Sequence, residues 1–161
     1  DYEVSKLYKK DKKIFIKLNK KLPKLICSFP INKNEITKAI LINKVKIKKI
    51  ITVVHFEIRK TLKTFLKKNR NKKIVILDIP LLLENKINHK NDILVFVDSK
   101  KIEIEKRLKK RSNFNRKLIN KFRKIQFSPT YKKRKSNFII KNNFKKKSLN
   151  TSIKKILSEI L

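Results

Sequence analysis

The sequence contains no glycine, methionine or tryptophan and only one cysteine, Cys27, among its 161 residues. A single cysteine excludes an internal disulfide framework and a multi-cysteine zinc site, and it favours a reducing compartment, so we expect a cytoplasmic protein. Tight turns and phosphate-binding loops normally use glycine, so its absence leads us to expect a fragment of a longer chain. Apolar runs stay far below the roughly 20 residues of a membrane-spanning helix, and we expect no membrane partner.

Acidic residues are also few, because 12 Asp and Glu stand against 47 Lys and Arg, which gives a formal net charge of +35. Such a charge attracts nucleic acids and anionic membrane surfaces. However, Lys, Asn and Ile supply 81 residues, and A/T-rich codons favour all three, so compositional drift alone produces a basic surface. Only 7 of the 47 basic residues are Arg, which DNA-reading proteins use most. We therefore do not expect a nucleic acid as a specific ligand.

The first half of the chain carries apolar residues at helical spacing. This spacing predicts one or two helices over residues 1–21, a short helix over 35–43 and a longer helix ending near residue 68. The segment between the first two, 22–34, contains two prolines and is predicted to be a loop. The longest helix has one apolar stripe and should bury a single face.

The second half alternates β-rich and helical segments. Residues 74–77 and 93–97 are continuous apolar runs, which predict strands covered on both faces of a parallel sheet. The segments that follow are predicted to be a helix capped by Asp98 and Ser99 and ending near Arg111, a basic helix over 115–127, a break at Pro129, a strand over 138–140 and an amphipathic C-terminal helix. This order predicts one α/β domain over 1–161, with a mostly parallel sheet flanked by helices.

Ligands of open parallel sheets bind beyond the carboxyl ends of the strands, where this sequence places Asp78 and Asp98. Asp78 begins a segment in which two carboxylates, Asp78 and Glu84, enclose the apolar residues Ile79 to Leu83. Termination of a strand and core packing explain this segment as well as a binding loop does.

A set of collinear segments resembles the dephospho-coenzyme A kinase family over essentially the whole chain. The most specific segment is Asp-x-Pro-Leu-Leu-x-Glu over residues 78–84, and residues 55–59 resemble the family's His-Pro-x-Ile-Arg motif. The other matching segments are Asp1 as the last residue of an Asp-x-Asp motif, the strand ending in Val97-Asp98, the pair Arg107 and Arg111, Arg123 to Gln126, and Asn137 to Asn142. The sequence departs from the family at Phe56, Leu83 and Asn137, where Pro, Phe and Asp are usual.

The family's nucleotide-binding P-loop, G-x-x-x-x-G-K-[ST], is missing from these residues, as it must be without glycine. In the family this loop precedes the Asp-x-Asp motif. The resemblance therefore implies an N-terminal truncation, and we expect the fragment itself to be inactive.

The resemblance implies a P-loop nucleoside/nucleotide-kinase-like fold and transfer of the γ-phosphoryl group of ATP to the ribose 3′-hydroxyl of dephospho-coenzyme A, the last step of coenzyme A biosynthesis. It implies Mg²⁺ with the ATP, without assigning a metal ligand. Asp1 and Arg111 would be catalytic, within a domain that has a helical acceptor-binding region over 35–70 and a lid over 111–127. The residues that would bind the acceptor are His55, Arg59, Asp78, Pro80, Leu81 and Glu84. The residues that would bind ATP are Arg107, Arg111, Gln126 and Asn142.

Other interpretations stay open at several of these positions. His55 also fits packing at the edge of the apolar stripe, and basic residues surround Arg107 and Arg111, so a solvated surface explains them too. His89 and Cys27 have no partner at ligand spacing and receive no role.

Two alternative functions are another P-loop small-molecule kinase and a basic nucleic-acid-binding protein on a degenerate kinase scaffold. Single-strand binders interleave exposed aromatic and basic residues. Most phenylalanines, including Phe65, Phe96, Phe122 and Phe138, fall at positions expected to face the core, which favours the kinase.

Overall fold

The computed structural model describes residues 2–112 and 114–161, with Lys44 described by its backbone alone. The chain divides into two compact units, one ending at Pro80 and one running from Leu81 to Leu161.

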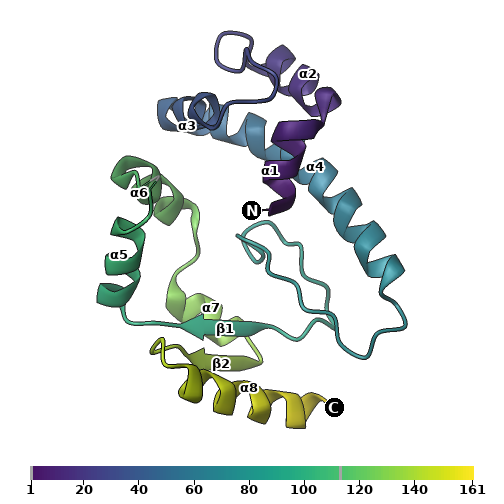
Figure 1. The fold of residues 1–161 in the computed structure, drawn as a ribbon, viewed down its shortest axis with the longest axis vertical. Helices are drawn as coiled ribbons and strands as arrows, with labels where there is room; N and C mark the ends of the chain where they lie inside the picture. The colour runs from purple at the N-terminus through teal and green to yellow at the C-terminus, as the bar shows by residue number, and fades with distance from the viewer. Residues whose placement is uncertain (1, 113) are drawn as a thin grey trace. The chain divides into compact units, whose positions relative to one another are not determined.

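The described part of the first unit is helical (Figure 1). Its helices are α1 (Tyr2–Lys10), α2 (Lys12–Lys21), α3 (Lys33–Ile42) and α4 (Lys44–Lys68). Asp11 separates the first two and caps α2, because its Oδ1 accepts a hydrogen bond of 3.1 Å from the backbone N–H of Ile14. Asn43 caps α4 in the same way, accepting at 3.0 Å from the N–H of Lys46. The helices predicted in this half of the chain are confirmed.

The core of the first unit is aliphatic and lies where α4 packs against α2 and α3. Ile14, Leu18 and Ile26 have no exposed surface at all. The other residues of this core are Leu22, Ile31, Ile36, Ala39, Ile40, Ile47, Ile50, Val53 and Val54. The buried face does not continue to the end of α4, because Phe65 is 45% exposed. The prediction that Phe65 faces the core is therefore wrong.

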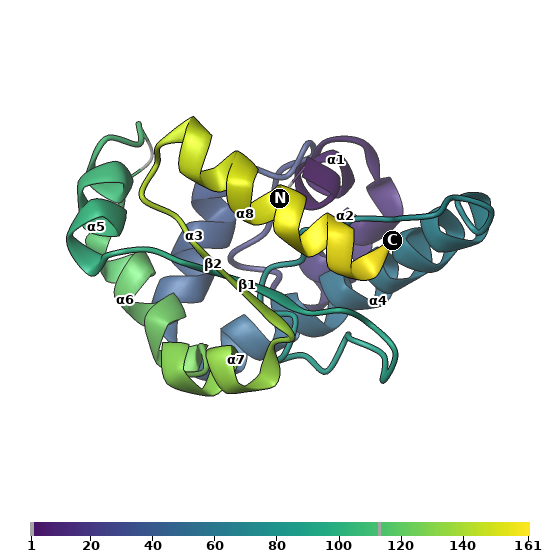
Figure 2. The same ribbon diagram turned by 90° about the horizontal axis from the view of Figure 1, so that it is seen from below.

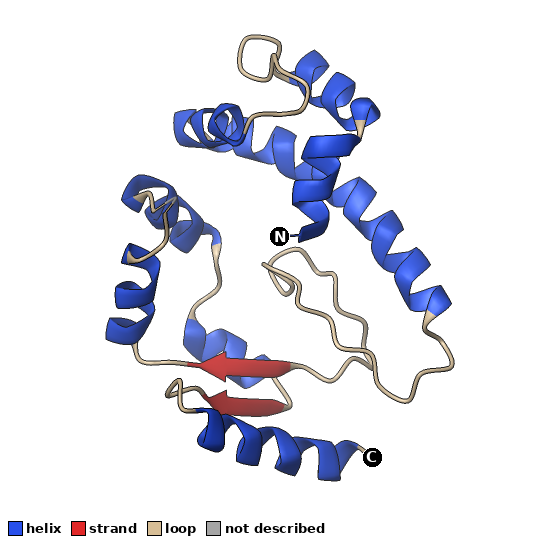
Figure 3. Cartoon of the chain, viewed as in Figure 1, coloured by secondary structure: helices blue, strands red, loops and turns tan. Residues whose placement is uncertain are grey.

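The second unit combines helices with two short strands (Figure 3). Its elements are β1 (Val95–Asp98), α5 (Lys101–Lys109), α6 (Arg116–Ile125), α7 (Pro129–Lys135), β2 (Phe138–Lys141) and α8 (Lys146–Ile160). The predicted strand over 138–140 and the predicted amphipathic C-terminal helix are confirmed. The second apolar run forms a strand that begins at Val95 rather than residue 93.

The two strands pair in parallel, with Val95 opposite Phe138 and Asp98 opposite Lys141. α8 lies along β2 in both views (Figures 1 and 2), and Ile140 is the buried residue of this strand. Phe96, Phe122 and Phe138 are all partly buried. The chain is therefore a helix-rich α/β structure with a small parallel sheet.

The run over residues 74–77 does not form the predicted strand. Ile76 is 84% exposed and Leu77 is 37% exposed. A strand needs a neighbour to receive its backbone hydrogen bonds, and in the described residues no strand pairs with this run. The apolar pattern alone was therefore insufficient to specify a strand.

One capping prediction in the second unit is also wrong. Asp98 and Ser99 do not cap α5, since Lys100 occupies the N-cap position and makes no side-chain capping bond. The predicted break at Pro129 is confirmed, because α6 ends at Ile125 and Pro129 is the first residue of α7, where proline lacks only an N–H that would have no partner. Ser128 caps this helix by accepting a hydrogen bond of 3.2 Å from the N–H of Tyr131.

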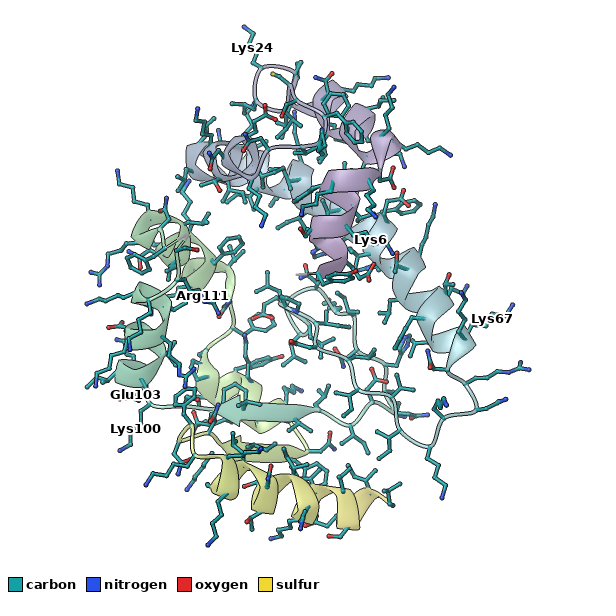
Figure 4. The ribbon with its side chains drawn as sticks, in the orientation of Figure 1. Lys6, Lys24, Lys67, Lys100, Glu103 and Arg111 are labelled. Carbon is teal, nitrogen blue, oxygen red and sulfur yellow. The ribbon has the colours of Figure 1, made fainter. Side chains whose placement is uncertain are left out.

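Many lysines extend from the ribbon into solvent, as Lys24, Lys67 and Lys100 do in Figure 4. Within the described residues, no helix is both long and apolar enough to cross a membrane.

Candidate functional site

His55 and Arg59 lie one turn apart on α4, so they share a face of the helix, as their spacing predicts. His55 is half-buried and Arg59 is exposed. Burial lowers the pKa of the His55 imidazole below 6.5, and the positive charge of Arg59 lowers it further. At neutral pH this face presents a guanidinium beside a neutral imidazole. That pair suits an anion held by Arg59 and a hydrogen bond made by His55.

Replacing His55 with glutamine is expected to make folding less sensitive to acid. The folded-state pKa of His55 is lowered, so the unfolded chain binds more protons between that pKa and about 6.5. The free energy of unfolding should therefore fall as the pH drops through this window and should be unaffected by His55 above it. Urea denaturation near pH 7.5 and near pH 5.5 measures the effect. The exposed His89, changed to glutamine, is the control, and an equal acid response in wild type and His55→Gln would contradict the expectation.

Phe56 and Glu57, the two residues of α4 that follow His55, contact lysines. Lys17 lies 2.8 Å from Oε1 of Glu57, and Lys60 lies 3.7 Å from its Oε2. The hydrogen bond from Lys17 is the main reason that the pKa of Glu57 is lowered. The same two ammonium groups lie 5.6 Å and 4.5 Å from the centre of the Phe56 ring, which is 56% exposed. Phe56, a departure from the family motif, therefore lies between a lysine of α2 and a lysine of α4.

The segment from Asp78 to Glu84 spans the boundary between the two units. Asp78 and Pro80 are exposed at the end of the first unit. Leu81 begins the second unit with a left-handed φ of 56°, a conformation that is costly for a residue with a Cβ. Its carbonyl oxygen accepts two hydrogen bonds from Asn85, at 3.0 Å from the backbone N–H and 2.9 Å from the side-chain amide. These bonds close a turn of the backbone from Leu81 to Asn85, and Glu84 lies within it.

The carboxylate of Glu84 is enclosed, with only 8% of its side chain exposed. Its Oε1 accepts hydrogen bonds from the backbone N–H of Phe127 and from Nζ of Lys132, each at 2.8 Å. Its Oε2 is buried and accepts no hydrogen bond from the residues that the structure describes. Burial raises the pKa of this carboxyl, but the hydrogen bonds and the charge of Lys132 lower it, and the net direction is downward. Glu84 is therefore ionised at neutral pH.

Arg107 and Asn142 are brought together by Phe144, a residue that sequence reasoning missed. The guanidinium carbon of Arg107 lies 3.8 Å from the centre of the Phe144 ring. The backbone N–H of Phe144 donates to Oδ1 of Asn142 at 2.8 Å, and the N–H of Asn142 donates to the carbonyl oxygen of Asp98 at 2.7 Å. Two predicted ATP-binding residues thus both contact Phe144, and one of them, Asn142, is bonded to the carboxyl end of β1. A flat guanidinium stacked on a ring is also a surface suited to a planar base.

Arg111 and Gln126 lie at the two ends of the predicted lid, and both are exposed. The backbone N–H of Arg111 donates to the carbonyl oxygen of Leu108 at 3.2 Å, while Gln126 follows the last turn of α6. Arg123 and Glu105 form an ion pair of 3.4 Å across α5 and α6. Between these helices is a shallow, open hollow, lined by Glu105, Leu108, Lys109, Phe114, Arg116, Ile119, Asn120 and Arg123.

Asp1, predicted to be catalytic, lies outside the described residues. Among the residues that the structure does describe, no group of three or more His, Cys, Asp or Glu side chains could hold a metal ion. Glu84 and Asp98 each face a lysine ammonium, at 2.8 Å and 2.6 Å, which makes them poor ligands for Mg²⁺. These two carboxylates do not fit a magnesium site.

Sequence reasoning missed the partners of the acidic residues. Three ion pairs join residues that are far apart in the sequence. Glu57 pairs with Lys17 at a separation of 40 positions, Glu84 with Lys132 at 48 and Asp98 with Lys133 at 35. Nothing in the sequence distinguishes these lysines from the others. Only Lys60, three residues after Glu57 on the same helix, had a spacing that could have identified it.

Comparison with known proteins gives one consistent result. A family model described as dephospho-CoA kinase matches residues 4–148. The chain is 29% identical to a dephospho-CoA kinase of Wolbachia pipientis wMel over 162 aligned positions, which cover 99% of this chain and 83% of that protein. It is 26% identical to the dephospho-CoA kinase of Wolbachia sp. subsp. Brugia malayi, with the same coverage. A dephospho-CoA kinase of Fusobacterium nucleatum subsp. nucleatum is 30% identical over 114 positions, covering 70% of this chain and 58% of that protein.

Proposed function

Because the chain belongs to the dephospho-CoA kinase family, we propose that it serves in transfer of the γ-phosphoryl group of ATP to the ribose 3′-hydroxyl of dephospho-CoA. The family consists of transferases of coenzyme A biosynthesis, for which ATP is a substrate. The match over residues 4–148 carries the proposal, because it includes every predicted site residue except Asp1. We propose a P-loop kinase fold on the same ground.

In the proposed reaction the 3′-oxygen of the acceptor attacks the γ-phosphorus, the bond to the β–γ bridging oxygen breaks, and ADP leaves. The hydroxyl proton passes to a carboxylate, for which Asp1 is the candidate. Arg111 would neutralise charge on the transferring group as the lid over 111–127 closes. Mg²⁺ would be held chiefly by the phosphates of ATP, since Glu84 and Asp98 are paired with lysines.

The acceptor would be bound by the residues that match the family's acceptor-binding motifs. In the region over 35–70, which contains α4 and most of α3, Arg59 would pair with a phosphate of dephospho-CoA beside His55. Asp78, Pro80, Leu81 and Glu84 would form the wall next to the ribose. Arg107 and Asn142, with Gln126, would hold the adenine end of ATP, which the stacking of Arg107 on Phe144 supports.

The 161 residues contain no glycine and therefore no P-loop motif. Backbone N–H groups of that motif cradle the phosphates of ATP, and its lysine reaches them. We therefore expect these 161 residues by themselves to bind dephospho-CoA without transferring phosphate to it.

Replacing Arg59 with alanine is expected to weaken binding of dephospho-CoA to the 161-residue chain by about 10- to 100-fold, the loss of a charge-assisted hydrogen bond. Isothermal titration calorimetry measures the dissociation constant. Arg70→Ala removes an equal charge from an exposed position just beyond α4 and should change the constant by less than about twofold, because it removes only a distant charge. No binding by the wild-type chain, or equal effects of the two variants, would oppose the proposed acceptor site.

One observation bears on the alternative function, binding of single-stranded nucleic acid. Phe56 is exposed between Lys17 and Lys60, as a base-stacking residue would be. A single such ring does not form the series of stacking platforms that this function uses. In the same titrations, a short oligonucleotide that displaces dephospho-CoA at equal concentration would favour the alternative.

A further inference from the structure

The helix α7 contains four consecutive basic residues, Lys132 to Lys135. Lysine is so frequent in this chain that the sequence alone does not distinguish these positions from other basic ones. Ser128 and Pro129 fix the start of this helix, and so they fix which way each basic residue points. Lys132 and Lys133 are the two that reach carboxylates, and those carboxylates come from different segments of the second unit.

The contact of Lys132 with Glu84 is unlike a surface ion pair. The side chain of Lys132 is 21% exposed and that of Glu84 is 8% exposed, and their atoms lie 2.8 Å apart. Exposed pairs contribute little, whereas breaking an enclosed pair leaves a buried charge without its partner. The backbone N–H of Phe127 donates to the same Oε1 at 2.8 Å. Two donors on one oxygen fix the rotation of the carboxylate.

Because Oε1 is held by two donors, Oε2 is the oxygen of the carboxylate that is left without a partner in the part of the chain that the structure describes. Oε2 is buried, and none of the described residues donates a hydrogen bond to it. A buried acceptor without a donor is costly. A hydroxyl group or a water molecule that enters with a ligand would satisfy it.

Lys133 makes the second contact of α7, to Oδ2 of Asp98 at 2.6 Å. Its ammonium also lies 5.9 Å from the centre of the Phe96 ring, on β1. Asp98 is the last residue of β1, and its carbonyl oxygen accepts from the N–H of Asn142. α7 thus links the turn that carries Glu84 to the strand end that carries Asp98 and Asn142.

We propose that Lys132 is a positioning residue that holds Oε1 of Glu84, so that Oε2 accepts a hydrogen bond from a hydroxyl of bound dephospho-CoA. This inference rests on the proposed function for its ligand. The ion pair itself does not depend on that function.

The test compares three variants of the 161-residue chain. Lys132→Met removes the ammonium and keeps the length of the side chain, Lys132→Arg restores a positive donor, and Lys135→Met removes one charge from an exposed position of the same helix. The first readout is the dissociation constant of dephospho-CoA by calorimetry. We expect Lys132→Met to weaken binding by about tenfold or more, Lys135→Met to change it by less than about twofold, and Lys132→Arg to recover most of the loss.

A double-mutant cycle separates positioning from general damage. If Lys132 acts through Glu84, then Glu84→Gln with Lys132→Met should bind dephospho-CoA no more weakly than the worse single variant. Additive losses would show that the two residues act independently and would overturn the proposal.

The second readout is the titration of the Glu84 carboxyl by ¹³C NMR without substrate. Its midpoint should move upward in Lys132→Met and stay unchanged in Lys135→Met. An unchanged midpoint in a folded Lys132→Met variant overturns the positioning role. If Lys132→Met does not fold, the Lys132→Arg variant tests the ion pair instead. A wild-type titration midpoint of Glu84 and a wild-type affinity for dephospho-CoA in that variant support the ion pair, and a loss of both opposes it. Absence of dephospho-CoA binding by the wild type would instead refute the proposed function, and the NMR titration would still decide whether Lys132 holds Glu84.

Discussion

Replacing Arg111 with alanine is expected to lower kcat for phosphorylation of dephospho-CoA by about 10³-fold or more, the effect of removing an arginine that contacts a transferring phosphoryl group. The negative charge on that group grows toward the transition state, and a guanidinium neutralises it with two donors in a fixed geometry. Arg111 lies in the loop after α5, where its side chain is exposed and its backbone is anchored to Leu108. The substitution should therefore leave the fold and its melting temperature unchanged.

The assay for Arg111 needs a polypeptide that carries a P-loop motif as well as these residues, because the 161 residues contain no P-loop motif. Lys110→Ala removes a charge from the adjacent exposed position and should lower kcat by less than about twofold, since screening weakens an exposed charge that makes no contact with the phosphoryl group. Arg111→Lys should recover little activity, since an ammonium lacks the fork of donors. Equal losses in Lys110→Ala and Arg111→Ala would show that bulk charge, rather than a specific contact, is responsible.

Replacing Leu18 with alanine is expected to lower the free energy of unfolding of the first unit by about 2–5 kcal/mol. Leu18 has no exposed surface and lies on α2 in the core formed with α4, so its removal leaves a cavity that the surrounding side chains fill only in part. A loss of this size is a large share of the total stability of a small domain. Urea denaturation followed by circular dichroism measures it.

Ile16 provides the matched control for Leu18, since it lies two residues earlier on the same helix and is 56% exposed. Ile16→Ala should change the free energy of unfolding by less than about 0.5 kcal/mol, as expected for a surface position. If both variants lost the same stability, the face of α2 that packs against α4 would be assigned wrongly.

Local features of the sequence were sufficient to predict most of the helices and the face of α4 that bears His55 and Arg59. Helix boundaries depend on groups a few residues apart, such as Asp11 with Ile14, and the spacing of four residues places two side chains on one face in any regular helix. The carboxyl end of β1 was predictable in the same way, from an apolar run that ends at Asp98.

Strand formation at residues 74–77 was not predictable from the run itself. A strand is stable only when it exchanges backbone hydrogen bonds with a neighbour, and no described strand pairs with residues 74–77. The capping of α5 was mispredicted because pairing with Lys141 extends β1 through Asp98, and α5 begins only at Lys101, which places Lys100 at the N-cap. In both cases a partner distant in the sequence decided the outcome.

The sequence by itself determined the family of this protein, its α/β character and the positions that are candidates for chemistry, because these depend on residue types in a fixed order along the chain. Only the tertiary structure decided which of the 47 basic residues contact which carboxylates, and that Phe144 joins Arg107 to Asn142. Ion pairs and stacking depend on distances of a few ångströms between residues far apart in the chain. In a sequence with so many identical lysines, only the fold supplies those distances.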